Sequence, residues 1–200
     1  TPEDTRDKVD LDVLAEEMLA APVGATSAAS ATSPDTASLP ETVFANVDLD
    51  RPCVAVFSHC FTDANHYASS TLHDDYYQWL RDTLAFALSD CTKTWLIKGH
   101  PHAPHYKEKA SVREVFADMA KGAGHVRLVP EHVSVAQLAP RLSAIVANAG
   151  TVCVEGPMLG VPTISAGLGI WSGYGFDNVA HTLAEYHDLL SRAGSLPAVT

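Results

Sequence analysis

The 200-residue chain has little positive charge. Its 13 lysines and arginines stand against 24 aspartates and glutamates, so the formal net charge is −11. Non-specific binding to nucleic acid requires a basic face, and this balance therefore argues against nucleic acid as a partner. It places no such limit on a small anionic ligand, because a few residues at a local site are enough to bind one.

Long apolar runs are also missing. No stretch of ~18 apolar residues is present, and the first residues do not form a charged-then-apolar secretion signal. We therefore expect a cytoplasmic protein, which can still act peripherally at the inner face of a membrane. The chain begins with Thr1-Pro2 and not with Met, and we expect it to be a fragment of a longer protein.

Patterns of metal ligands are sparse. The four cysteines form no CxxC pair and no zinc spacing, and we expect them to be reduced thiols. His100, His102 and His105 are closely spaced, but Pro101 breaks any helix that would align them, and no carboxylate or cysteine stands at ligand spacing. We expect no metal site.

The composition is that of a globular protein, with 46% apolar and 18% charged residues. Residues 1–20 contain an amphipathic helical pattern, which we expect to belong to an upstream domain or to pack on it. Residues 21–42 are dominated by Ala, Ser, Thr and Pro, which is typical of a flexible linker. Residues 43–200 are expected to form one further domain.

Strand and helix patterns alternate in that domain. Apolar runs at 52–57, 94–98, 125–129, 144–147 and 161–165 are separated by amphipathic segments. This alternation predicts an α/β fold: an open parallel, Rossmann-like sheet of about five strands with helices on both faces. Ligands of such sheets bind beyond the carboxyl ends of the strands, at the point where the strand order reverses. Polar residues gather at those ends.

The segment of residues 143–165 is the most informative. Its pattern predicts a strand, a turn at Gly150, a helix over 152–159 with Thr151 at the N-cap, and a second strand. A helix that begins after such a turn offers unpaired N–H groups to a phosphate. Glu155 lies one turn into the helix, on the face of Thr151, where it can accept hydrogen bonds from ribose hydroxyls. The alternative is a capped helix with an exposed glutamate.

Two other strand ends hold candidate chemistry. Lys98 and His100 follow the second strand, where both can approach a phosphate leaving group, and Pro101 restricts the backbone beside His100. The alternative is a histidine in a polar loop. The loop after the first strand contains four further candidates, which we assign to the acceptor side: Ser58, His59, Asp63 and Asn65. A Ser–His–Asp triad is a weaker interpretation, because sequence neighbours rarely form one.

A third segment is rich in glycine and aromatic residues. Gly167, Gly169 and Ser172 partly imitate a dinucleotide-binding GxGxxG, but the third position is serine and no clear helix follows, so a nicotinamide site is not expected. Trp171 and Tyr174 lie in the same loop. Such residues either stack on bases and sugars or pack between domains.

Together these motifs resemble a known family. They run in the order K-x-H-P (98–101), V-x-L-V-P (126–130), S-x-x-x-L (134–138), N-x-G-T (148–151), V-x-V-E-x-x-x-L-G-x-P-x-I-x-x-G (152–167) and Y-G-F (174–176). Over residues 51–190 the chain is similar to the donor-binding, carboxyl-terminal half of GT-B glycosyltransferases. Within these it resembles the bacterial capsule polysaccharide biosynthesis proteins, which include Kdo transferases that use a CMP-activated sugar.

The resemblance implies roles for single residues. His100 would contact the donor phosphate as the catalytic residue, with Lys98 and Pro101 beside it. Gly150 and Thr151 would hold the same phosphate, and Glu155 would bind the ribose. Residues 130–134, with Ser134, would border the base. GT-B enzymes need no bound metal, since a helix dipole and basic side chains offset the charge of the leaving group.

The resemblance also implies partners: a nucleotide-sugar as co-substrate with no further cofactor, a polysaccharide or lipid-linked glycan as acceptor, and an upstream amino-terminal half that supplies acceptor binding and the catalytic acid or base. Only one half is present here, so little or no transfer is expected from this chain alone. A second departure is Gly99, where relatives often have proline. Three alternatives stay open: a UDP-sugar 2-epimerase relative, a CDP-glycerol glycerophosphotransferase relative, and a nucleotide-binding domain without catalysis.

Overall fold

The computed structural model describes residues 41–44, 48, 50–62, 71–106 and 108–198. These residues lie in the unit that runs from Ser38 to Thr200. The predicted helix and linker of residues 1–42 fall almost entirely outside the described residues, so the proposed division into three segments stays a prediction. Asp63 and Asn65, two of the acceptor-side candidates, lie outside the described residues as well.

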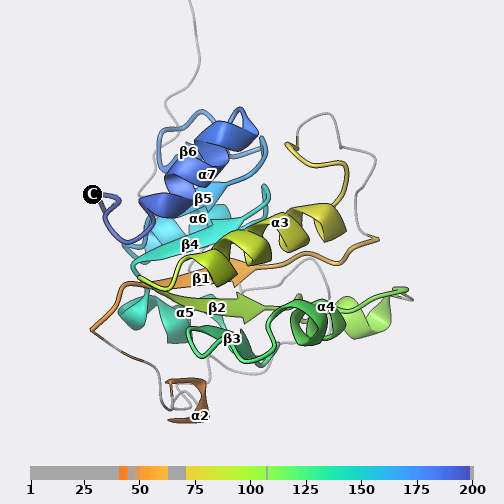
Figure 1. Cartoon of the computed structure of the whole chain (residues 1–200). Coiled ribbons are helices and arrows are strands. Elements are labelled where there is room, and N and C mark those ends of the chain that lie inside the picture. Colours follow the sequence, from red (N-terminus) through yellow and green to blue (C-terminus); the bar gives the residue numbers. More distant parts are fainter. Residues whose placement is uncertain (1–40, 45–47, 49, 63–70, 107, 199–200) are drawn as a thin grey trace, which may run out of the picture. The chain divides into compact units, whose positions relative to one another are not determined.

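A sheet of six strands forms the centre of this unit, and every pair of neighbouring strands is parallel (Figure 1). The strand order is β3-β2-β1-β4-β5-β6, which is the order of Rossmann-like folds. The predicted parallel α/β fold is therefore confirmed. The strands are β1 (Cys53–Phe57), β2 (Thr94–Lys98), β3 (Val126–Val129), β4 (Ala144–Ala147), β5 (Thr163–Ser165) and β6 (Asp177–Val179).

The sixth strand was not predicted. β6 has only three residues, Asp177–Val179, and two of them are polar, so neither length nor alternation marks it as a strand. Its pairing with β5 places it in the sheet: Ile164 is opposite Asn178, and the Asn178 side-chain amide donates to the Thr163 carbonyl at 2.9 Å. Tertiary pairing therefore overrides a weak local signal.

Six helices accompany the sheet within the described residues: α2 (Glu41–Phe44), α3 (Tyr76–Ser89), α4 (Val112–Met119), α5 (Val135–Leu138), α6 (Val152–Met158) and α7 (Leu183–Ser191). Short 3₁₀ turns cover Ala103–His105 and Ala139–Arg141. The amphipathic pattern after β2 predicts a helix over about 107–121, but α4 is shorter. It begins only after Ser111, whose hydroxyl and the Glu114 carboxylate form a reciprocal capping box.

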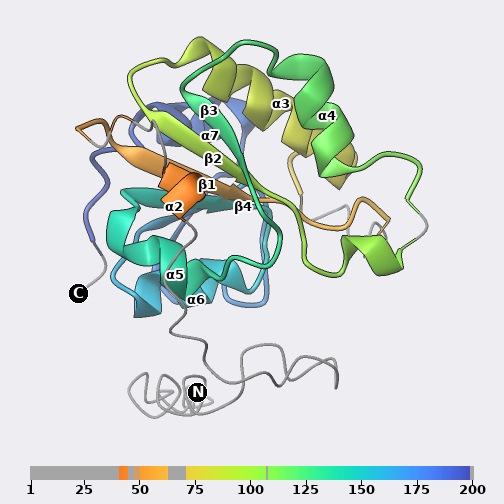
Figure 2. The ribbon, with the colours of Figure 1, turned by 90° about the horizontal axis from the view of Figure 1, so that it is seen from below.

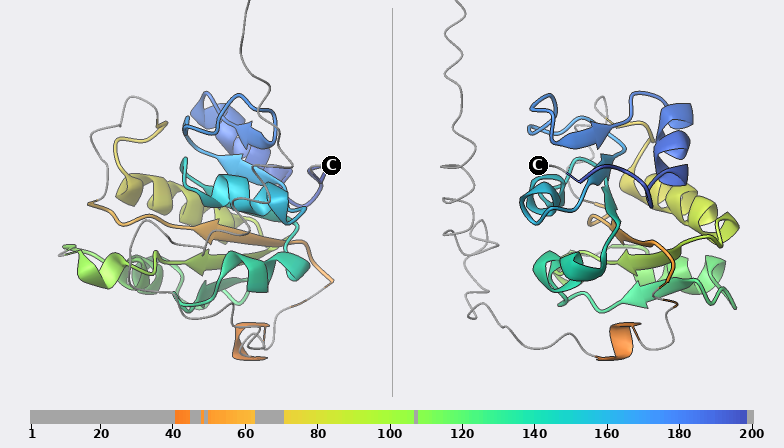
Figure 3. Two further views of the ribbon diagram at one scale, coloured as in Figure 1. Left: turned by 180° about the vertical axis from the view of Figure 1, so that it is seen from behind. Right: turned by 90° about the vertical axis from the view of Figure 1, so that its left-hand side faces the viewer.

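The helices cover both faces of the sheet, as predicted (Figures 2 and 3). One face packs on α3, α4 and α7, and the other packs on α2, α5 and α6. The strands supply both faces by alternation: Val54 and Val56 of β1 belong to the first core, whereas Cys53 and Ala55 belong to the second. Because both faces are covered, β2 and β4 are buried along their whole length, and β1 is buried in all but its last residue, Phe57.

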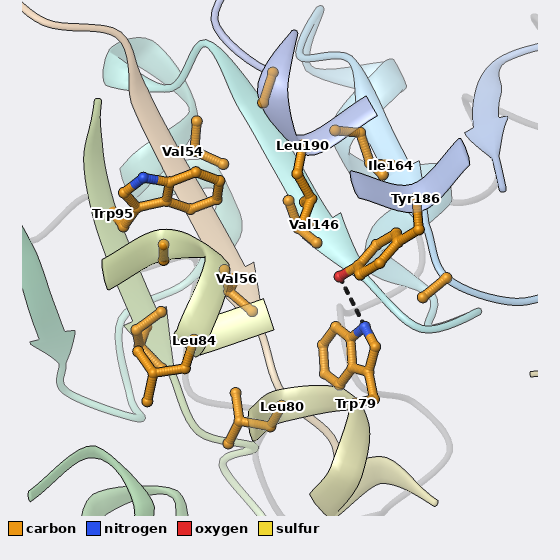
Figure 4. Close-up of a cluster of buried hydrophobic side chains, with 14 of the residues drawn as sticks. Val54, Val56, Trp79, Leu80, Leu84, Trp95, Val146, Ile164, Tyr186 and Leu190 are labelled. Carbon is orange, nitrogen blue, oxygen red and sulfur yellow. Dashed lines mark hydrogen bonds between the residues drawn. The ribbon is translucent and has the colours of Figure 1, made fainter. Parts of the chain in front are cut away.

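The larger core contains a buried hydrogen-bond network (Figure 4). The indole N–H of Trp79 donates to the Tyr186 hydroxyl at 2.9 Å, and Tyr186 and Thr83 share a hydrogen bond of 2.7 Å. The Thr83 hydroxyl donates to the Trp79 carbonyl at 2.8 Å. Since that bond uses the Thr83 proton, the Tyr186 hydroxyl must donate to Thr83 and accept from Trp79. The network joins α3 to α7.

A polar cluster joins the same two helices nearer the surface. One carboxylate oxygen of Asp82 on α3 accepts hydrogen bonds of 2.9 Å from His73 Nε2 and from His187 Nε2 on α7. Burial alone would raise the pKa of Asp82, but these two bonds outweigh it and lower the pKa. The contact also fixes the segment that precedes α3, which includes His73.

The helices of the described residues are all too short or too polar to cross a lipid bilayer. This agrees with the lack of a long apolar run in the sequence.

Candidate functional site

The strand order reverses between β1 and β4, because β1 lies next to β2 on one side and next to β4 on the other. In open parallel sheets ligands bind beyond the carboxyl ends of the strands at this point. The segments that leave those ends are Ser58-His59 after β1, Gly99–His102 after β2, Pro130–His132 after β3 and Asn148–Thr151 after β4. Among the predicted site residues that the structure describes, Lys98 is the last residue of β2, and the others lie in these segments or close to them.

Lys98 is a buried cation with only 5% of its surface exposed. Its ammonium donates to the Gly99 carbonyl at 3.3 Å and lies 5.5 Å from the centre of the Phe57 ring. Burial lowers its pKa from 10.5 to about 8, against the opposing effect of the Glu131 and Glu155 carboxylates. The fold therefore places Lys98 within electrostatic reach of Glu155, a second residue that the sequence assigns to the donor. A buried ammonium that makes few hydrogen bonds to the protein is suited to an anionic ligand.

Glu131 belongs to the same group, although the sequence indicated it only as part of the segment 130–134. It follows β3, and a Cβ placed on Gly99 would come 3.2 Å from its Cγ and 3.3 Å from its Oε1. Gly99 thus leaves room for the glutamate side chain. Beside it is a pocket of about 310 Å³, lined by Pro101, Arg113, Pro130, Glu131 and His132. The contribution of Arg113, from α4, was not foreseen.

His100 is half-buried at the start of the loop after β2. Its Nδ1 accepts a hydrogen bond of 3.2 Å from the backbone N–H of His102, and the two rings make an edge contact at 5.5 Å. Because Nδ1 accepts this bond, the neutral tautomer of His100 carries its proton on Nε2. That tautomer can donate a hydrogen bond to a phosphate oxygen.

The turn after β4 differs in detail from the predicted phosphate cradle. The hydroxyl of Thr151 makes no capping hydrogen bond to α6, and the residue has helical backbone angles. The N–H of Ala149 is directed inward, to Ser165 Oγ at 3.0 Å. The backbone groups of Ala149 and Gly150 also form hydrogen bonds with the Cys153 thiol, which is buried beneath the turn. Only the N–H groups that follow, at Thr151 and Val152, are suited to an outside anion.

The two described acceptor-side candidates have different surroundings. Ser58 is buried, and its hydroxyl donates to the His59 carbonyl at 3.2 Å. The His59 ring stacks on Tyr76 at 4.3 Å and faces Gly150, where a Cβ would come 3.0 Å from its Cε1. His59 therefore lies against the turn after β4, on the side predicted for the donor.

The predicted donor-side residue Ser134 has a local structural role. It caps α5 in a reciprocal box with Gln137, in which the Gln137 N–H donates to Ser134 Oγ at 3.2 Å and the Gln137 side chain accepts from the Ser134 N–H at 2.9 Å. Its neighbours Pro130, Glu131 and His132 line the pocket. A ligand in the pocket would therefore meet the first part of the segment 130–134.

No group of three or more histidines, cysteines or carboxylates with metal-binding geometry is found in the part of the chain that the structure describes. The His102 ring contacts the rings of His100 and His105 edge-on, at 5.5 and 5.9 Å between ring centres.

Gly156 on α6 packs closely against the sheet beneath the turn. A Cβ there would come 2.5 Å from Thr163 Cγ2 and 2.9 Å from Ile145 Cδ1. Helix propensity favours alanine by about 1 kcal/mol, but overpacking costs about 1–3 kcal/mol. We expect Gly156→Ala to lower the free energy of unfolding by roughly 1 kcal/mol net, measured by urea denaturation. Gly124→Ala, at a position with open space, is the control, and equal stability of the two variants would contradict the packing argument.

The four cysteines are free thiols, as predicted, and only Cys91 is exposed. Burial raises the pKa of Cys53 and of Cys153 to about 12, so neither forms the reactive thiolate near neutral pH. We expect one of the four thiols to react rapidly with a disulfide reagent at pH 8, and the other three only after unfolding. Rapid reaction of the Cys91→Ser variant would show that the buried thiols open easily.

The strand order and the polar groups at the carboxyl edge define the chain as a Rossmann-like α/β domain with a candidate site for an anionic ligand. No family model matches the sequence, and no curated protein matches it either.

Solved structures do match. The β-Kdo 2,4-transferase KpsC of Thermosulfurimonas dismutans is 19% identical, over 68% of this chain and 43% of its own, with a TM-score of 0.46. The glycotransferase of kitacinnamycin is 14% identical, over 74% and 36%, with a TM-score of 0.45. The heptosyltransferase WaaC of E. coli, solved with ADP-2-deoxy-2-fluoro heptose, is 16% identical, over 77% and 44%, with a TM-score of 0.40.

These three proteins are glycosyltransferases. This chain spans less than half the length of each of them. Likeness at this level of identity and TM-score concerns the course of the backbone alone, so the function has to be argued from the residues of the site.

Proposed function

We propose that the chain is the donor-binding part of a glycosyltransferase for capsule or surface polysaccharide and that its donor is a CMP-linked sugar. The observation that carries this proposal is Lys98: a buried cation at the carboxyl edge of a parallel sheet, beside the pocket between Pro101 and Pro130–His132. Burying an ammonium is costly, and a site for an anion next to it provides a reason for keeping the charge.

The phosphate of the donor would lie near Lys98. The ammonium supplies charge, the Nε2–H of His100 supplies a hydrogen bond, and the N–H groups at Thr151 and Val152 supply further donors. Thr151 is exposed, so its hydroxyl is accessible to the ligand. In the transfer step the acceptor hydroxyl attacks the anomeric carbon, the bond from that carbon to the phosphate oxygen breaks, and CMP leaves. Lys98 and His100 would offset the negative charge that grows on that oxygen.

The nucleoside would occupy the pocket. Pro101 and Pro130 offer apolar surfaces to a base, and the Arg113 side chain is exposed beside them. The Glu131 carboxylate, and Glu155 from α6, can accept hydrogen bonds from ribose hydroxyls. The pocket and Lys98 share Glu131, which acts on the pKa of Lys98 and lines the pocket. A single ligand can therefore reach both.

The remaining partners belong to the same proposal. The acceptor would be a polysaccharide or a lipid-linked glycan, and an amino-terminal half would supply acceptor binding and the base that takes the proton of the acceptor hydroxyl. The site would lie in the cytoplasm, where it can serve acceptors held at the inner face of the membrane. No cofactor beyond the nucleotide-sugar is needed for this chemistry.

Calorimetric titration of CMP, CDP and UDP tests the proposal on the full 200-residue chain. We expect cytidine nucleotides to bind in preference to UDP, and His100→Ala to weaken binding by about 1–3 kcal/mol, the range of a charge-assisted hydrogen bond. His105→Ala is the matched control, because this exposed histidine lies in the same loop. Preference for UDP would favour an epimerase-like enzyme. Preference for CDP over CMP would favour a glycerophosphotransferase, and binding of none by folded protein would refute the proposal.

A further inference from the structure

Ala149 has a backbone conformation that needs support. Its φ angle is 59°, and it is the one residue other than glycine with a positive φ among those that the structure describes. The left-handed region disfavours alanine, because Cβ comes too close to the neighbouring carbonyl oxygen. Such a residue keeps this conformation only where its surroundings hold it. Ala149 lies two residues before Thr151, whose N–H group and that of Val152 are assigned to the donor phosphate.

The side chain that holds it is Ser165, the last residue of β5, which is fully buried. Ser165 Oγ accepts the hydrogen bond from the Ala149 N–H at 3.0 Å and donates its own proton to the Gly167 carbonyl at 2.6 Å. A hydroxyl has one proton and two lone pairs, so both bonds form at once. The pairing of Ser165 with Ala147 in the sheet sets the position of this hydroxyl beneath the turn.

We propose that Ser165 is a positioning residue for donor binding: its hydroxyl holds Ala149 in the left-handed conformation and thereby sets the N–H groups of Thr151 and Val152 for the phosphate. This inference rests on the proposed function. The hydroxyl joins the turn after β4 to the first residues of the loop after β5, so the two segments keep one arrangement.

Two further contacts support this coupling. A Cβ on Gly169 would come 3.2 Å from the Ala149 carbonyl oxygen and 3.3 Å from the Ala149 Cβ, so the loop after β5 packs directly on the turn. The start of that loop is in turn bonded to the segment before α3, through the Leu72 N–H to the Ala166 carbonyl at 3.1 Å and a bridge between Thr71 and Gly167. The Ser165 side chain therefore links the turn after β4 to the loop after β5, which is itself bonded to the segment before α3.

Calorimetry with CMP, CDP and UDP on Ser165→Ala, in the full chain, tests the inference. Without the hydroxyl, Ala149 leaves the left-handed region part of the time, and the apparent Kd rises as the competent fraction falls. We expect the Kd of the preferred nucleotide to rise roughly tenfold. Ser143→Ala is the matched control: Ser143 Oγ also accepts a backbone hydrogen bond, from the Cys53 N–H at 3.3 Å, but at the opposite end of β4.

A second substitution separates positioning from a general loss of packing. Glycine adopts positive φ without the Cβ penalty, so we expect Ala149→Gly in the Ser165→Ala background to return the Kd to within about threefold of wild type. Failure of this rescue would overturn the inference, as would an unchanged Kd in Ser165→Ala.

Amide hydrogen exchange provides a readout that needs no ligand. The Ala149 N–H should be protected in wild type and in Ser143→Ala, and should exchange faster in Ser165→Ala, whereas protection of the β4 amides stays the same. Equal protection of Ala149 in all three proteins would contradict the role of Ser165. If wild type binds no nucleotide while Ala149 loses protection in Ser165→Ala, the proposed function fails and the role of the hydroxyl in holding the turn stands.

Discussion

Lys98→Met is expected to make the protein more stable and to abolish nucleotide binding. The pKa of Lys98 is about 8 in the folded protein against an ordinary value of 10.5. A difference of this size corresponds to about 3 kcal/mol that the buried charge costs the folded state at neutral pH. Methionine has a similar length and no charge, so we expect the free energy of unfolding at pH 7 to rise by about 2–3 kcal/mol. Urea denaturation measures this change.

The same substitution has a defined pH dependence. Between about pH 8 and 10.5 the unfolded chain holds the Lys98 proton and the folded chain does not, so the stability of wild type rises with pH across this window. The advantage of Lys98→Met is therefore complete below pH 8 and is lost by about pH 10.5. Lys121→Met, at an exposed position, is the control and should change stability by less than about 0.5 kcal/mol at either pH.

The affinity of wild type for CMP should change with pH in the opposite direction to its stability. Wild type needs the Lys98 charge for a phosphate, so its affinity for CMP is expected to fall as the pH rises through 8, whereas Lys98→Met binds weakly at every pH. The proposal would be contradicted if Lys98→Met were less stable than wild type or bound CMP as tightly. Either result would show that Lys98 is a structural ion-pair partner and not a charge retained for ligand binding.

Tyr186→Phe is expected to destabilise the protein by about 1–3 kcal/mol, the cost of a buried polar group without a partner. Tyr186 is completely buried, and its oxygen accepts the hydrogen bond of Trp79 Nε1 at 2.9 Å. Removal of the hydroxyl leaves the indole N–H in a core where Trp79 itself has no exposed surface. Thr83 is affected less, since its proton remains bonded to the Trp79 carbonyl.

The control for this prediction is Tyr174→Phe, because the Tyr174 side chain is 59% exposed and its hydroxyl can bond to water. Thermal and urea unfolding of both variants should show a loss for Tyr186→Phe and a change within about 0.5 kcal/mol for Tyr174→Phe. Similar small effects in both variants would mean that the Trp79 indole finds another acceptor and that the hydroxyl does not join α3 to α7.

Part of the candidate site was predictable because it is local. Lys98 is the last residue of β2, and His100 follows it two residues later. The chain at this point has the short apolar run with a polar end that is typical of buried parallel strands. Gly160 has a φ of 75° directly after α6, the conformation that a glycine at the end of a helix commonly adopts. The capping roles of Asp75 and Ser134 follow from the same local rules.

Other parts depend on residues that are distant in the sequence. Glu131 lies against Gly99, 32 positions earlier, and Ser165 bonds to Ala149, 16 positions earlier. Neither contact has a local signature, because a glutamate after a strand and a serine at the end of a strand are common in any loop. Thr151 occupies the predicted N-cap position of α6, but its hydroxyl does not cap the helix, because its own backbone angles are already helical.

The sequence by itself determined the alternation of strands and helices, the parallel sheet and the polar strand ends, since hydrophobic periodicity and turn residues act over a few neighbouring positions. Only the tertiary structure decided which strand ends lie side by side, how deeply Lys98 is buried, and that Ala149 is held in a left-handed conformation. The order β3-β2-β1-β4-β5-β6 and the loss of solvent around a charge arise from the packing of distant segments, and that packing sets the electrostatics of the site.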